Sequence, residues 1–226
     1  MLILTKASKS RLALVLAAVA ILMSGCSSDS GAERPSSEQR GVPAGRICDG
    51  TLDTSAVTAL QRMSGANRFE ELTGTNQAGE PNEFSVNKSV KHLHSKYLKQ
   101  SICSVYKVGD EKPLLRVRFS ASKYYPSGKE DPSGREVHYP LGVFAQVGIN
   151  GADLFFRCPT KAPVKDAYIG DTDYVKAEMY TATNRLRGND KAGDIMVVLN
   201  SMARAVAEAA GCASQAGLPT RVPDAV

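Results

Sequence analysis

Residues 143–158 read VFAQVGINGADLFFRC and contain the clearest turn signal of the 226-residue chain. Asn150-Gly151 supplies the two positive-φ positions that a type I′ turn needs. In the segment after the turn, Leu154 and Phe156 fall on one face of a strand and Phe155 on the other. We therefore predict a β-hairpin with strands at 143–149 and 152–158, so antiparallel pairing is the basis of the fold.

Three more segments have the period-two alternation of half-buried strands. Residues 102–108 and 115–119 are separated by a Gly-Asp-Glu-Lys-Pro turn, and Arg116 and Arg118 alternate with apolar residues in the second segment. They predict a hairpin with one polar face. Residues 175–181 alternate in the same way and are expected to form an outer strand.

Helical spacing of apolar residues marks three further segments. The first begins after a cap at Asp53 or Thr54 and ends at Gly65, the second runs from about Val86 to Lys99, and the third covers about 191–210. Two helices, antiparallel strands and a long helix in this order predict an α+β domain. We expect a sheet of about five strands with the helices packed on one face.

The N-terminus has the three parts of a secretory signal sequence. A basic start at residues 6–11 and an apolar run over 12–23 precede Gly25-Cys26. This order resembles the lipobox of bacterial lipoproteins, which implies a lipid on the Cys26 thiol and cleavage just before it. The alternatives are an apolar helix, buried or membrane-spanning, and a plain signal peptide that is cut elsewhere.

The rest of the chain divides by composition. Residues 1–25 are the expected signal peptide, and 26–46, rich in Ser, Gly, Pro and charge, are expected to be the lipidated cysteine and a disordered tether. Residues 47–212 have the length and apolar content of a single domain. Residues 213–226 are expected to be a flexible tail.

The charge and the cysteines of this domain limit the kinds of partner and of cysteine chemistry that we expect. The net charge is +5, and residues 1–25 hold three basic and no acidic residues, which leaves about +2 (5 − 3). So small a charge argues against a nucleic-acid partner. Four cysteines remain beside Cys26, and we expect two disulfides among them. Three connectivities are possible. We favour Cys48–Cys103 with Cys158–Cys212, because each would join a helix-bearing segment to its nearest strand.

Three short patterns carry a family resemblance. Ile47-Cys48-Asp49-Gly50 precedes a short helix, Ser101-Ile102-Cys103-Ser104 opens a strand, and residues 202–212 end a helix at Gly-Cys. Together they look like the small secreted lipoproteins of actinomycete bacteria, some of which have a PsbP-like α+β fold. The resemblance implies a location at the outer face of the cytoplasmic membrane and a fold, and it transfers no catalytic residue.

Two motifs suggest chemistry. Ser85-x-x-Lys88 has the spacing with which penicillin-recognising enzymes activate a serine, but no Ser-Asp-Asn or Lys-Thr-Gly follows it. His92-x-His94 would hold a metal in a strand, whereas on a helix the two side chains diverge by about 200°. We expect neither a catalytic site, nor a metal, nor a cofactor.

A basic helix face is the last candidate. On a helix over residues 86–99, Lys88, Lys91, His92 and Lys99 gather opposite the apolar stripe, where they could meet anionic lipid or an anionic wall polymer. A solvated helix face is the alternative. The sequence thus favours a non-catalytic lipoprotein anchored at the cytoplasmic membrane's outer face. It would carry a lipid or small ligand, or dock an envelope partner, and a serine hydrolase using Ser85 and Lys88 is the weaker alternative.

Overall fold

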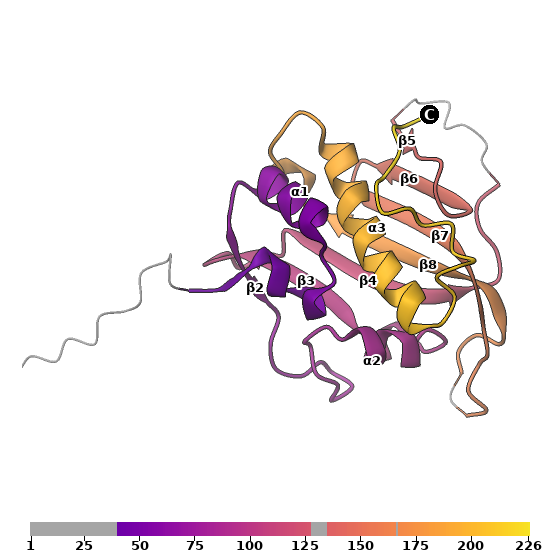
Figure 1. Cartoon of the computed structure of the whole chain (residues 1–226). Coiled ribbons are helices and arrows are strands. Elements are labelled where there is room, and N and C mark those ends of the chain that lie inside the picture. The colour runs from indigo at the N-terminus through magenta and orange to yellow at the C-terminus, as the bar shows by residue number, and fades with distance from the viewer. Residues whose placement is uncertain (1–39, 128–134, 166) are drawn as a thin grey trace, which may run out of the picture. The chain divides into compact units, whose positions relative to one another are not determined.

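The computed structural model describes residues 40–127, 135–165 and 167–226, which belong to one compact unit. The predicted signal peptide, Cys26 and most of the predicted tether lie outside the described residues, as do residues 128–134 of the loop before β5. The α+β class is confirmed, since the described residues form three α-helices and one antiparallel sheet (Figure 1).

The sheet has eight strands among the described residues, not about five. They are, in chain order, β1 Val42–Pro43, β2 Arg68–Glu71, β3 Ile102–Lys107, β4 Leu115–Ser122, β5 Val137–His138, β6 Phe144–Gly148, β7 Gly151–Thr160 and β8 Thr172–Thr181. The additional strands β1, β2 and β5 have two to four residues, too few to show an alternating pattern in sequence.

The strand order is β1-β2-β3-β4-β8-β7-β6-β5, so β8 is an interior strand and the prediction of an outer strand is wrong. Strand β8 pairs with β4 from Tyr174 to Thr181 and with β7 on its other side. Its polar residues alternate because one face of the sheet, and not one edge, meets solvent.

The sheet therefore has two faces with different chemistry. The inner face is apolar and buried, and at its centre lie Val117, Phe119, Leu154, Phe156, Val175 and Ala177. The outer face carries the alternate residues of the same strands, which are Arg116, Arg118, Asp153, Phe155, Arg157, Tyr174, Lys176, Glu178 and Tyr180.

Helices α1 (Thr54–Ser64) and α3 (Lys191–Ala209) pack side by side and cover one face of the sheet (Figure 1). The predicted ends of both are confirmed. The Asp53 carboxylate accepts a hydrogen bond from the Ala56 N–H, Gly65 ends α1 with φ 67°, and Asp190 caps α3. Asp194 in the first turn of α3 is buried, and it pairs with Arg62 of α1.

The predicted helix over 86–99 is too long. Helix α2 spans Val86–Lys91, and only Tyr97–Lys99 forms a further short 3-10 turn, η3. Between them the chain bonds to distant segments, because the Leu93 carbonyl accepts from Ala121 N–H and the His94 carbonyl from Tyr168 N–H. These long-range backbone bonds replace the i→i+4 bonds that would continue the helix.

The β6–β7 hairpin is confirmed, but its turn lies one residue earlier than predicted. Gly148 pairs with Gly151, so Ile149 and Asn150 form the loop, and neither has a positive φ. Gly151 is needed for a different reason. A Cβ at this position would lie 1.8 Å from the Met179 carbonyl oxygen of β8.

Two disulfides, Cys48–Cys103 and Cys158–Cys212, join the sheet to the segments that lead into α1 and out of α3. This is the connectivity favoured from the sequence. Cys48 and Asp49 have φ values of 51° and 60°, which non-glycine residues seldom adopt. The first disulfide and a hydrogen bond from Val86 N–H to the Asp49 carboxylate hold this turn.

The ends of the described chain are tied to the domain. Residues 42–43 pair with β2, and Ala44 is buried, so the domain begins before residue 47. At the other end, residues 213–226, which the sequence suggests are flexible, contact the domain. Ala216 is 1% exposed, Asn200 donates to the Pro219 carbonyl, and Val226 N–H donates to His138.

Candidate functional site

The four residues of the predicted basic face do not form one surface. Lys88 and Lys91 lie on α2, His92 follows its last turn and Lys99 lies in η3. Lys91 and Lys99 are exposed, whereas the Lys88 side chain is 16% exposed. Because the helix ends at residue 91, the spacing argument that gathered these four side chains no longer applies.

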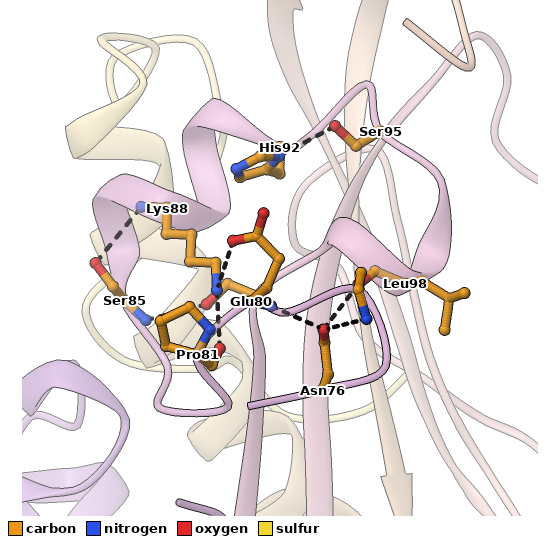
Figure 2. A network of polar contacts seen from close by, with 10 residues as sticks. Asn76, Glu80, Pro81, Ser85, Lys88, His92, Ser95 and Leu98 are labelled. Carbon is orange, nitrogen blue, oxygen red and sulfur yellow. Dashed lines mark hydrogen bonds and ion pairs between the residues drawn. The ribbon is translucent and has the colours of Figure 1, made fainter. Parts of the chain in front are cut away.

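Lys88 is held inside a polar network (Figure 2). Its ammonium donates to the Pro81 carbonyl at 2.8 Å and pairs with the Glu80 carboxylate at 3.4 Å. Asn76 fastens the same loop by accepting from Glu80 N–H and donating to the Leu98 carbonyl. Lys88 therefore stabilises the loop over 74–82 and has no free charge to offer a partner.

The same network separates Ser85 from the amine that would activate it. The Ser85 hydroxyl accepts from the backbone N–H of Lys88 at 3.5 Å as the cap of α2, while the Lys88 ammonium points to Pro81 (Figure 2). A serine nucleophile requires the amine itself within hydrogen-bond reach of the hydroxyl. In this geometry Ser85 is a helix cap.

The two neighbouring histidines contact different parts of the chain. His92 Nδ1 lies 3.2 Å from the Ser95 hydroxyl, and burial lowers the pKa of His92. His94 is 4% exposed, with Nδ1 near the Ile169 and Gly170 carbonyls and Nε2 near Thr160. Each ring is thus engaged in its own contacts, and the rings do not converge on a metal position.

One cluster of metal-ligand types exists among the described residues, at Cys48, Glu71 and Cys103. Its two sulfur atoms are joined in a disulfide, so they offer no thiolate ligands. Glu71 accepts a hydrogen bond from Cys48 N–H at 2.9 Å, and burial raises the pKa of its carboxyl group. This cluster is part of the structural framework.

The outer face of the sheet contains the feature best suited to binding. Two adjoining hollows of about 180 and 290 Å³ share Tyr97, Ile102 and Arg116. We call them together the outer-face groove, which is lined at its centre by Tyr97, Ile102, Ser104, Arg116, Glu178 and Tyr180. Strands β3, β4 and β8 form its floor, and η3 with the loop over 72–82 forms one wall.

A row of ion pairs crosses the outer face from β4 through β8 to β7. Arg118 pairs with Glu178, Glu178 with Lys176, and Lys176 with Asp153 at 2.8 Å. The Arg118 guanidinium also lies 4.9 Å from the centre of the Tyr97 ring. Each of these four charges therefore has a partner, and they form what we call the ion-pair line.

Arg116 differs from this line. It is exposed on β4 and faces Ser104 on one side and Tyr180 on the other. Within the described part of the chain, its side chain has no hydrogen bond or ion pair. The sequence placed Arg116 on a polar strand face, but its isolation depends on the pairing of β3, β4 and β8, which no local pattern indicates.

Among the described residues, none of the helices combines the length and apolar character of a membrane span. Comparison with protein-family models, with curated proteins and with solved structures finds no significant match to this chain.

Proposed function

We propose that this protein is a non-catalytic, lipid-anchored binding protein on the outer face of the cytoplasmic membrane. The basic start, the apolar run and Gly25-Cys26 support the anchor, and the two disulfides suit an oxidising compartment. The binding role rests on one observation. The outer-face groove brings together half-exposed Tyr97 of η3 and Tyr180 of β8 with the Arg116 guanidinium of β4, which has no side-chain partner among the described residues.

A carrier with its ligand between the sheet and α3 has less support than a docking protein. The α3 residues that face the sheet, among them Ile195, Leu199 and Met202, are at most 2% exposed. A lipid chain in that position would have to displace a close-packed core. The outer-face groove is already open, so the binding partner is more simply an envelope component that approaches from solvent.

Of the four residues of the predicted basic face, we assign only Lys99 to this docking surface. Lys99 lies in η3, two residues from Tyr97 of the groove, and is exposed. Lys88 belongs to the loop network and is not part of the docking surface. A positive rim near the groove favours an anionic partner, which agrees with an envelope component.

The hydrolase alternative, centred on Ser85 and Lys88, makes a separate prediction. Exchange of Ser85 for Ala would abolish the activity of a serine hydrolase, whereas a binding protein would lose only the helix cap. The cap contributes about 1 kcal/mol to stability. An unchanged cellular phenotype of Ser85→Ala would therefore remove the hydrolase.

Retention on isolated cell envelopes tests the proposed function. A secreted, unlipidated form that starts at Ser27 is compared with the variants Tyr97→Ala and Tyr180→Ala, whose side chains are 49% and 53% exposed. We expect retention to fall about tenfold in the double variant, since aromatic anchors dominate binding surfaces. Tyr168→Ala, at a tyrosine that is 72% exposed outside the groove, is the control.

The anchor is tested in the full chain. Cys26→Ser should remove the incorporation of labelled fatty acid and release the protein to the medium. Equal retention of the wild type and the double tyrosine variant would contradict docking through the groove. Labelling that persists in Cys26→Ser would contradict the lipid anchor.

A further inference from the structure

We propose that the outer-face groove binds the carboxylate of an acidic sugar residue, such as a uronic acid unit of a glycan, with Arg116 and Ser104 as the anion-binding pair. This inference rests on the proposed function, because it names the chemistry of the partner that the groove would dock.

The guanidiniums of Arg116 and Arg118 both point outward from β4, and they differ in whether a partner holds them. Arg118 is fixed by Glu178 and by the Tyr97 ring, whereas Arg116 has no side-chain partner in the described part of the chain. A guanidinium presents a planar fork of donors that matches a carboxylate in bidentate geometry. Arg116 is free to make such a contact.

Ser104 lies directly opposite Arg116 on β3. Ser104 is 5% exposed and lines the smaller hollow together with Arg116. Its hydroxyl is not one of the buried polar atoms that lack a partner among the described residues, so solvent reaches it through the hollow. A ligand oxygen held by Arg116 would replace water as the acceptor for this hydroxyl. Two donors on neighbouring strands, one charged and one neutral, therefore face the same space.

The charge balance favours a single negative charge. The charged residues that line the two hollows are Arg116, Arg118 and Glu178, which are two cations and one anion. Because Arg118 and Glu178 neutralise each other, one positive charge is left for a ligand. A phosphate dianion would bring its second charge close to Glu178, whereas a carboxylate is matched by Arg116 alone.

Strands β4 and β8 are paired on both sides across the floor of the groove, so their backbone groups are used within the sheet. On β3, pairing with β2 begins at Val105, and Ile102 and Ser104 pair with β4 alone. Side chains are therefore the main recognition groups of the groove. Tyr97 and Tyr180 offer half-exposed aromatic surface with polar tips, on which a sugar ring can pack while its hydroxyls stay hydrated.

The size of the groove agrees with this assignment. Its larger hollow, of about 290 Å³, lies at the lower end of the ~300–1,000 Å³ typical of small-molecule pockets. It is also open to solvent along the sheet, as a site for one unit of a polymer must be. The groove therefore fits a single acidic sugar unit whose neighbours continue outside.

Calorimetric titration with trigalacturonic acid tests the inference, with the methyl-esterified trisaccharide as the uncharged ligand. The protein is the folded form that starts at Ser27. Arg116→Gln should weaken binding at least tenfold and Ser104→Ala about threefold to tenfold, because each removes a hydrogen bond to the carboxylate. Arg157→Gln removes an exposed arginine from the same sheet face outside the groove, and it should change affinity less than twofold.

Three results would overturn the inference. These are equal binding of the acid and its methyl ester, wild-type affinity in both Arg116→Gln and Ser104→Ala, and tighter binding of a poly(glycerol phosphate) than of the uronate. Thermal unfolding of each variant shows whether it is folded, and the two substitutions test the pair independently.

The titration tests the acidic-sugar assignment, and the envelope assay tests the docking function, so the two proposals can be refuted independently. Envelope retention that depends on Tyr97 and Tyr180, without uronate binding, would refute the sugar and leave the docking protein. Uronate binding that depends on Arg116, with retention unaffected by the tyrosine variants, would support the site and refute the proposed docking function.

Discussion

The two faces of the sheet come from the same strands and have opposite properties. On the inner face, Val117, Phe119 and Phe156 are at most 1% exposed. On the outer face the side chains of the ion-pair line are 23–33% exposed. Because buried apolar surface stabilises a fold far more than half-exposed ion pairs do, the stability of this domain resides mainly on the inner face, and the outer face is free to change and to bind.

The largest expected effect contrasts one aromatic residue from each face. Phe156→Ala removes a side chain that is 0% exposed beneath the helices, and it should lower the free energy of unfolding by about 3–5 kcal/mol. Tyr180→Ala on the outer face should cost less than about 1 kcal/mol. Urea denaturation with the disulfides intact measures both. Equal losses would show that the outer face contributes to the fold as much as the inner face does.

The next largest effect is expected at Gly151, where β7 lies close to the backbone of β8. Gly151→Ala places a Cβ against the Met179 carbonyl oxygen, so β7 and β8 must separate, with a cost of about 1–3 kcal/mol. Gly148→Ala is the matched control, because a Cβ at that end of the hairpin would meet nothing within 4 Å. Denaturation midpoints that fall equally in both variants would contradict the contact with the Met179 carbonyl as the cause.

These two faces could be foreseen in part from the sequence. The alternation of Arg116 and Arg118 with apolar residues predicts one buried and one polar face, and the structure has both. Alternation carries no information about a strand's position in the sheet, which is why the interior strand β8 was expected at an edge. Strands β1 and β2 form through pairing with segments far away in the sequence, and β5 pairs with the next strand, β6. All three are too short to show a periodicity of their own.

The candidate site could be foreseen less well. Residues 86–99 do have helical spacing of apolar residues, yet the N–H groups of Ala121 and Tyr168 bond to the carbonyls of Leu93 and His94, and the helix ends at Lys91. Because the helix is shorter, the four residues of the predicted basic face no longer lie on one helix face. The outer-face groove forms only when three strands and a loop come together in the fold. Whether Arg116 has an ion-pair partner depends on which side chains the fold brings beside it, and the local sequence does not show this.

A smaller effect tests how little the ion-pair line contributes to stability. Lys176→Gln removes the cation between Asp153 and Glu178, which then face each other across β7 and β8. The expected loss is about 0.5–1 kcal/mol at low salt, and it should shrink in 1 M NaCl as screening weakens the repulsion. Lys161→Gln breaks a pair outside the sheet face and should have no measurable effect. A salt-independent loss at Lys176 would point to its packing on the Phe155 ring instead.

The smallest expected effect concerns Glu71, a carboxylate on the inner side of β2. Burial raises its pKa above the ordinary value of 4.5, so the folded protein binds this proton more readily than the unfolded chain does. Glu71 therefore opposes folding when it is ionised, and the stability that its protonation adds appears as the pH falls through the folded pKa towards 4.5.

Glu71→Gln should accordingly raise the free energy of unfolding at pH 7, by about 0.5 kcal/mol or less, and the gain should vanish near pH 4. The amide oxygen of Gln can still accept the hydrogen bond from Cys48 N–H, which isolates the charge as the cause. Denaturation at pH 7, 5 and 4 measures the gain, with Glu70→Gln on the other face of the strand as the control. A loss of stability at pH 7 would mean that the ionised carboxylate strengthens its bond to Cys48 by more than its burial costs, and that the inner face tolerates charge after all.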